Sequence, residues 1–273
     1  EAGLRTKDVH AICDVNASLK GIGQTGHKGI GWKSVFRVTD CPHVISHSFA
    51  FKFDVTGPLG KLAFVTPTSL TDEELDALPD RVKTAQAAGH TVMFLPLRSK
   101  VDMAAAEAEM RQIADQHLCL VFLRRLTRIS MRYPDGGITH LQRAESQFAS
   151  LYFPTASTAA VSITDIAANG QGNRFAPEYL IHKHPVEMPN GETQSELTLA
   201  FQANESDDAP LQPLFTFLPV RAVGFRFAIQ GPFELTADRG NLHGKSEWNR
   251  TLCCAVPAAF AGALQAIPEL RSR

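Results

Sequence analysis

Residues 26–36 read GHKGIGWKSVF, a glycine-rich turn that runs directly into an apolar segment. Residues 16–31 contain five glycines, a density that is typical of a loop whose backbone N–H groups are open to a ligand. Large apolar residues then follow at helical spacing (Trp32, Val35 and Phe36), so we expect a helix to begin near Gly31. The stretch predicts a phosphate-binding turn at a helix N-terminus, where the positive end of the helix dipole favours an anion.

The glycine turn fits three patterns, and the residues alone leave them open. Residues 21–26 match GxGxxG, but no apolar strand precedes them, as a dinucleotide fold requires. Residues 26–34 nearly match the P-loop, but Trp32 turns Lys33 by about 100° on a helix, away from the position of the P-loop lysine. The third pattern is a glycine cradle that binds phosphate without that lysine, with cations nearby from Lys20, Lys28 and Lys33. A plain surface loop is the non-functional alternative.

Size and charge limit the classes of function. The 273 residues carry a net charge of −1 and 44% hydrophobic residues, so a folded protein of two domains is expected. The near-neutral charge argues against nucleic acid as a partner, and no apolar run is long enough to span a bilayer. Five cysteines without CxxC spacing favour a reducing compartment, cytoplasmic or nuclear. Two histidines in alternation, at 182 and 184, are expected to be an exposed strand pair rather than a metal site.

The pattern along the chain mixes helices with hairpins, which indicates an α+β class. Helices are expected over 4–15, 72–78, 101–118 and 257–267, the last with a proline in its first turn. Strands are expected over 49–53, 62–65, 91–97 (central), 129–133, 138–143, 160–166, 196–201, 214–220 and 225–229. The division is placed at residue 145, giving domains 1–145 and 146–273.

Several boxes together resemble one family. HKGIGWKSVFRVTD, from His27 onward, is similar to the second glycine box of the GHKL ATPases, which include the ninety-kilodalton heat-shock chaperones. The closer likeness is to the NO VEIN and sacsin type, which carries an Hsp-like ATPase module. Further similar segments lie along nearly the whole chain, at residues 1–4, 16–20, 89–97, 215–221, 227–233 and 239–249. The resemblance implies a partial Bergerat-type α/β two-layer sandwich over 1–145, followed by a middle-type α/β domain.

The resemblance also implies roles for single residues. Gly3 would lie near the adenine, and Thr91 would hold a water bridged to it. Ser18 and Lys20 would belong to a mobile lid. Arg239 would reach the γ-phosphate as the catalytic arginine, where charge develops during phosphoryl transfer. The phosphates of ATP would be wrapped by the turn itself, at Gly26, His27, Lys28, Gly29, Ile30, Gly31 and Trp32.

Two parts of the family's site are expected upstream of Gly3. The resemblance places the general-base Glu, the Asn that holds Mg²⁺ and the adenine-reading Asp before this position, and the given sequence does not contain them. The chain is therefore interpreted as an N-terminally truncated ATPase module that binds ATP with Mg²⁺. It is expected to hydrolyse ATP only when the upstream helix that carries this Glu and Asn is supplied. The alternative is a non-catalytic scaffold, or protein-interaction module, with a vestigial nucleotide site.

Overall fold

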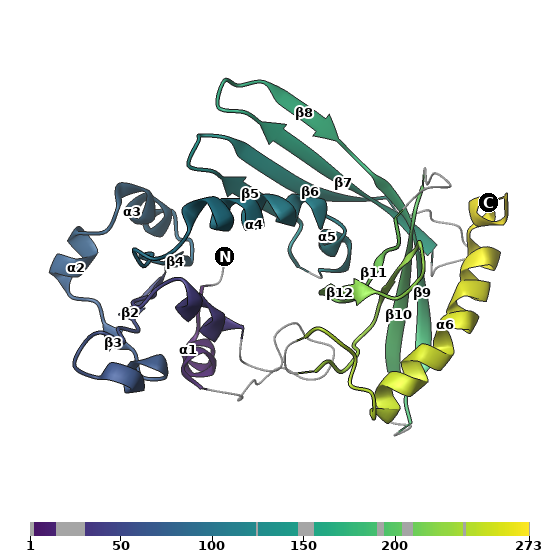
Figure 1. The fold of residues 1–273 in the computed structure, drawn as a ribbon, viewed down its shortest axis with the longest axis horizontal. Helices are drawn as coiled ribbons and strands as arrows, with labels where there is room; N and C mark the ends of the chain where they lie inside the picture. The colour runs from purple at the N-terminus through teal and green to yellow at the C-terminus, as the bar shows by residue number, and fades with distance from the viewer. Residues whose placement is uncertain are drawn as a thin grey trace. The chain divides into compact units, whose positions relative to one another are not determined.

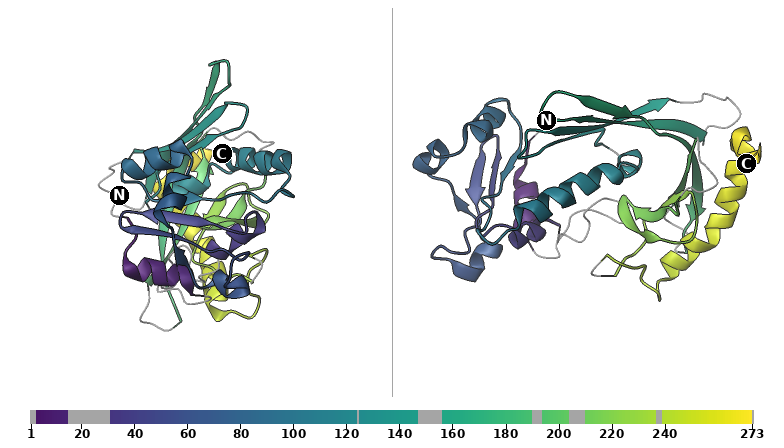
Figure 2. Two further views of the ribbon diagram at one scale, coloured as in Figure 1. Left: turned by 90° about the vertical axis from the view of Figure 1, so that its left-hand side faces the viewer. Right: turned by 45° about the horizontal axis from the view of Figure 1, so that its top comes forward.

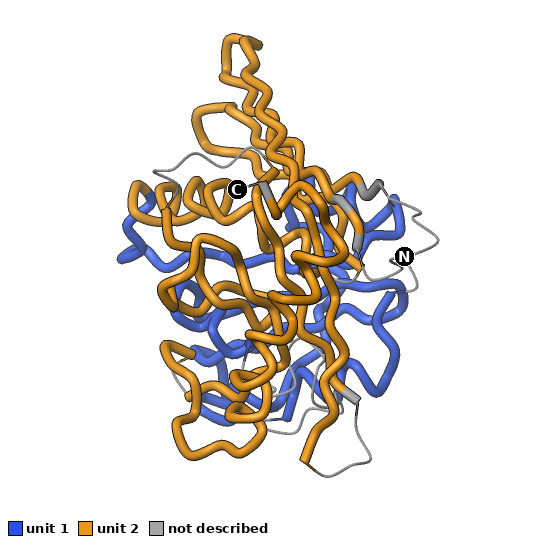
Figure 3. The backbone as a smooth tube through the Cα atoms, turned by 90° about the vertical axis from the view of Figure 1, so that its right-hand side faces the viewer, with its two compact units in different colours: residues 1–103 blue, residues 104–273 orange. Residues whose placement is uncertain are grey.

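The computed structural model describes residues 3–14, 31–123, 125–146, 156–189, 194–203, 210–236 and 239–272. The chain forms two compact units, residues 1–103 and 104–273 (Figure 3). The sequence placed the division at residue 145, but β6 (Ile138–Ser146) pairs with β7 (Ala156–Ile166) along its whole length. A boundary at 145 would cut through this strand pair, so the helix before β5 and the β5–β6 hairpin belong to the second unit.

Unit 1 is built around a four-stranded antiparallel sheet in the order β3-β2-β1-β4 (Figure 1). The β1–β2 hairpin pairs Ser46 with Phe49, which leaves a two-residue turn at its tip. Chain order in this unit is α1 (Thr6–Cys13), η1 (Trp32–Arg37), β1 (His43–Ser46), β2 (Phe49–Lys52), η2 (Gly60–Phe64), β3 (Thr68–Ser69), α2 (Asp72–Asp76), α3 (Asp80–Ala87) and β4 (Val92–Phe94).

Each face of the unit 1 sheet buries its own apolar cluster, as strand alternation requires. The α1 face packs Val44 and Phe51 with Phe36 and Phe53, and side chains of α1 and η1 contact this cluster. The α2 face carries Ile45, which packs with Leu70 and Leu78 and with side chains of α2 and α3. The unit is therefore a sheet with a helical layer against either side.

Unit 2 is built on a nine-stranded sheet in the order β12-β11-β13-β10-β9-β7-β6-β5, with β8 paired to β7. Only the β11–β13 pair is parallel among the strand pairs described. Its elements are α4 (Met103–Asp115), α5 (Cys119–Phe122), β5 (Arg128–Arg132), β6, β7, β8 (Gly172–Phe175), β9 (Glu178–Glu187), β10 (Gln194–Gln202), β11 (Pro213–Thr216), β12 (Leu218–Ala222), β13 (Ala228–Gln230), α6 (Glu247–Ala266) and η3 (Pro268–Ser272).

Helices also cover both faces of the larger sheet. Residues of α5 join one cluster with Leu141, Val161 and Ile181. The opposite face packs Leu197 and Leu199 against α6, which runs along β9 and β10 (Figures 1 and 2). The observed class is α+β, as the sequence predicted.

Several local predictions are confirmed and others are wrong. The capping box at Thr71 and the hairpin turn at Asp135-Gly136 form as expected. Residues 62–65 are not a strand, because residues 62–64 belong to a 3-10 helix and Val65 is its C-cap. β4 is an edge strand rather than a central one. The last helix begins at Glu247 because Ser246 caps it, which leaves Pro257 inside the helix.

Candidate functional site

The segment around Gly3 meets the tip of the β1–β2 hairpin. Gly3 has φ +64°, a left-handed conformation that favours glycine. A Cβ added at Gly3 would lie 1.8 Å from Cδ2 of His47, so the imidazole occupies the space that any side chain would need. Glycine is required here for both reasons, and the ring of His47 lies directly against the Gly3 backbone.

Ser46 joins this segment to β4. The backbone N–H of Leu4 donates to Ser46 Oγ over 2.9 Å, and Ser46 Oγ lies 2.8 Å from Thr91 Oγ1. Ser46 is fully buried, so its hydroxyl is held by these contacts away from solvent. Register explains the meeting, because β1 and β4 pair Ile45 with Val92 and the next pair along would be Ser46 and Thr91. Two residues assigned to adenine binding, 88 positions apart in the sequence (91 − 3), are thereby brought together.

Sequence reasoning did not identify Ser46 or His47 in this site. Ser46 ends a short apolar strand and carries no motif, and its role depends on the register between β1 and β4. Met93 follows Thr91 on the same face of β4 and is 52% exposed, opposite Val44. The structure therefore brings together the Gly3 backbone, a hydroxyl pair whose Ser46 member is buried, and the exposed side chain of Met93.

The helix that follows the glycine turn differs from the predicted one. The segment after Gly31 is a six-residue 3-10 helix, shorter than the α-helix that the sequence predicted. A Cβ at Gly31 would meet no atom of the described residues within 4 Å, so none of them blocks approach to the backbone there. Trp32 packs into the cluster on the α1 face, with its ring centroid 6.0 Å from that of Phe53. Trp32 is thus a packing residue whose contact with phosphate stays a prediction.

Lys33 does not extend into the open space as a free cation. Its ammonium donates to the carbonyl oxygen of Phe64 over 2.5 Å and lies 4.9 Å from the ring centroid of Phe53. Burial lowers the pKa of Lys33, and the charges of Cys13 and Asp14 raise it by less. The expectation of Lys33 as a phosphate cation is therefore not met in this conformation, and any contact with phosphate requires the side chain to leave Phe64.

The remaining assigned residues fall in two groups. Arg239, in unit 2, has φ +60° and donates from Nη2 to Thr216 Oγ1 over 3.2 Å, so its side chain is directed onto β11. Ser18, Lys20, Gly26, His27, Lys28, Gly29 and Ile30 lie outside the described residues. Their roles, and the contact of Arg239 with phosphate, stay predictions.

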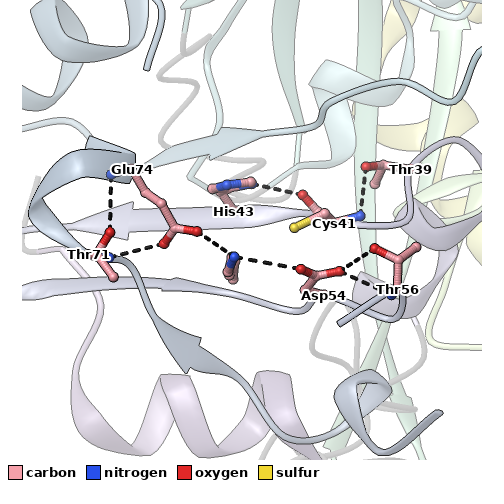
Figure 4. Close-up of polar contacts among 8 residues, drawn as sticks. Thr39, Cys41, His43, Asp54, Thr56, Thr71 and Glu74 are labelled. Atoms are coloured by element: carbon pink, nitrogen blue, oxygen red, sulfur yellow. Dashed lines mark hydrogen bonds and ion pairs between the residues drawn. The ribbon is translucent and has the colours of Figure 1, made fainter. Parts of the chain in front are cut away.

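The α2 face of the unit 1 sheet holds a separate polar network (Figure 4). Lys52 Nζ lies 2.5 Å from Glu74 Oε1 and 3.6 Å from Asp54 Oδ2. Glu74 also completes the capping box of α2 with Thr71. This network ties β2 to the start of α2 and lies on the face of the sheet away from Ser46.

Two groups beside that network would be candidates for nucleophilic chemistry, but their ionisation argues against it. Burial, with a smaller effect from Asp54, raises the pKa of the Cys41 thiol to about 11, so the thiolate is scarce near neutral pH. Burial lowers the pKa of His43, whose Nδ1 lies 2.8 Å from the carbonyl oxygen of Cys41 rather than from its sulfur. We interpret this network as structural.

Neither a metal centre nor a membrane-spanning helix is found among the described residues. Among them, no three His, Cys, Asp or Glu side chains gather closely enough to hold a metal ion. None of the helices in the described ranges has the length and hydropathy needed to cross a bilayer. The candidate site is the cluster at Gly3, Ser46 and Thr91, on the evidence of its hydrogen bonds.

Comparison with known proteins gives one informative relative. Protein NO VEIN of Arabidopsis thaliana is 28% identical over 288 residues, an alignment that covers all of this chain and 10% of NO VEIN. The chain therefore spans about a tenth of the length of this relative. No family model matches the chain, and no solved structure matches it. The similarity is thus to one segment of NO VEIN, and it supports the NO VEIN part of the sequence-based resemblance.

Proposed function

We propose that this chain is an ATP-binding module of the Hsp-like type, with a Bergerat-type nucleotide site in unit 1. The observation that carries the proposal is the convergence of Gly3 and Thr91 through Ser46. The family resemblance assigns both residues to the adenine. Their closeness in unit 1 supports that assignment.

The arrangement of unit 1 is consistent with a purine at this site. Thr91 lies at the start of an edge strand, on the face that α1 partly covers. A hydroxyl there can bind a ring nitrogen or a bridging water, and Met93 offers apolar contact to the base. The glycine turn that ends at the open backbone of Gly31 would bind the phosphates.

ATP with Mg²⁺ would act as a conformational switch in this proposal. Phosphate would bind at the glycine turn, and the resemblance predicts that Arg239 then leaves Thr216 for the γ-phosphate. Hydrolysis further requires a general base and a ligand for Mg²⁺, which the resemblance expects upstream of Gly3. ATP binding and ATP hydrolysis are therefore separate predictions.

A non-catalytic interaction module with a vestigial site is the second candidate. The position of Lys33 favours it, because the ammonium is held by the Phe64 carbonyl and the Phe53 ring. Without the charge of Lys33, the phosphate turn would bind triphosphate less strongly. The two candidates differ in whether the native polypeptide binds ATP at all.

Isothermal titration of ATP with Mg²⁺ into the native polypeptide that contains residues 1–273 distinguishes them. The wild type is expected to bind, and Thr91→Val is expected to weaken binding by about two- to tenfold, the effect of one lost hydrogen bond. Thr68→Val is the matched control, because Thr68 lies exposed on β3 of the same sheet. Absence of ATP binding by the folded wild type would refute the proposal and favour the interaction module.

A further inference from the structure

His182 is a buried histidine whose ring nitrogens have no hydrogen-bond partner among the described residues. It lies on β9, is 4% exposed, and both Nδ1 and Nε2 are enclosed without a donor or acceptor. This corrects the sequence-based expectation of an exposed pair, because His182 is buried and His184 is half-buried. A neutral imidazole carries one N–H donor and one acceptor, so both are desolvated without compensation here.

The ring of His182 faces α6 at close range. A Cβ added at Gly262 would lie 2.9 Å from His182 Nε2, so only a helix without a side chain at this position can approach so closely. His182 pairs with Leu199 across β10, within the apolar cluster that α6 covers. His182 therefore lies within the contact between the helix and the sheet.

The described surroundings contain no carboxylate that could neutralise a protonated His182. His184 follows on the same face of β9, with its ring centroid 6.3 Å away. On β10 the residues of that face are Leu197, Leu199 and Phe201, with the non-titrating Ser195 further along opposite Val186, and Glu196 lies on the opposite face. On α6, the residues next to Gly262 in the sequence are alanines. The titratable residues of α6 lie in its first half and those of η3 lie beyond its end: Glu247, Arg250, Cys253, Cys254, Glu269 and Arg271. On β7, His182 pairs with Ala156, which is not titratable.

A proton on His182 would thus be both buried and repelled. Burial, and less strongly the charge of His184, lowers the pKa of His182 below its ordinary value of 6.5. With α6 displaced, the imidazole would regain water and titrate near that ordinary value. By linkage, contact between α6 and the sheet is fully favourable above about pH 6.5 and weakens as pH falls below it.

We propose that His182 makes the docking of α6 on β9 and β10 sensitive to acid, so that protonation of its imidazole releases the helix from the sheet. The released state exposes the apolar face of β9 and β10, including Leu197 and Leu199. The device requires only the buried imidazole, its neighbour His184 and the close approach at Gly262. It is independent of whether unit 1 binds ATP.

Hydrogen exchange at pH 7.5 and pH 5.5, corrected for intrinsic exchange rates, tests this proposal. In the wild type, peptides from α6 are expected to lose protection by up to about tenfold, the effect of one proton over one pH unit below 6.5. The reference is the His182→Leu variant at the same two pH values, because the unit 1 sheet carries its own buried histidine, His43. His182→Leu should abolish the change in α6, whereas the matched variant His184→Leu should retain most of it.

Two outcomes would overturn the proposal. One is wild-type α6 protection that is equal at both pH values, and the other is a His182→Leu protein that still loses protection in acid. If His182→Leu does not fold, an NMR titration of the wild-type histidines decides the question. His182 should then titrate together with the loss of α6 protection, and its titration with α6 still protected would contradict the mechanism.

Discussion

The contact between Ser46 and Thr91 can be measured directly with a double-mutant cycle. Ser46→Ala removes a fully buried hydroxyl that accepts from the Leu4 N–H and lies 2.8 Å from Thr91 Oγ1. The Leu4 N–H loses that acceptor, and leaving a partly buried group unpaired costs about 1–3 kcal/mol. Thr91→Val removes the other hydroxyl while keeping the branched shape of the side chain.

The structure sets the size expected for each arm of the cycle. Ser46→Ala should lower the free energy of unfolding of unit 1 by about 1–3 kcal/mol, and Thr91→Val by about 0.5–1.5 kcal/mol. Because the two hydroxyls contact each other, the double mutant should be less destabilised than the sum, with a coupling of about 0.5–1 kcal/mol. For a unit of about 100 residues, 1 kcal/mol corresponds to a shift in Tm of about 4–8 °C.

The assay must report unit 1 alone, because two compact units need not unfold together. The chain has two tryptophans, and Trp32 lies in unit 1 while Trp248 lies in unit 2. Urea unfolding followed by fluorescence in a Trp248→Phe background therefore reads unit 1. Strictly additive effects at unchanged m-values would refute the contact on which the site is built.

Two further predictions concern unit 1. Gly3→Ala places a methyl group against the His47 ring at a left-handed φ, so it should lower the Tm of unit 1 by several degrees in a thermal melt. Adding His47→Ala to this variant should restore part of the lost Tm. If the Tm does not recover, backbone strain alone is responsible for the loss. The hydrogen bond from Lys52 lowers the pKa of Glu74 from its ordinary value of 4.5, so the stability that Glu74 contributes is present above that value and is lost as pH falls through the lowered pKa. Glu74→Gln should remove this part of the acid dependence between pH 5 and pH 3 in urea titrations, and an unchanged profile would contradict the role of the Lys52 pair.

Local signals predicted much of unit 1 and of the hairpins. The capping box at Thr71, the alternation over Phe49–Lys52 and the Asp135-Gly136 turn each depend on neighbouring residues, so the sequence was sufficient for them. Residues 62–65 were misjudged because a short apolar run can form a strand or a helical turn, and its surroundings decide between them. The sequence did not predict the start of α6 after Ser246, because proline favours the first turn of a helix and Pro257 indicated a later start.

By itself, the sequence determined the α+β class, and the family resemblance predicted that Gly3 and Thr91 belong to one site. Only the tertiary structure decided that Ser46 joins them, because the strand register aligns residues that no sequence spacing relates. It also decided the burial of His182, since alternation gives a strand two faces but does not say that a helix with Gly262 covers one of them. Short-range patterns act through neighbouring residues, whereas pairing and burial depend on distant segments that meet only in the folded chain.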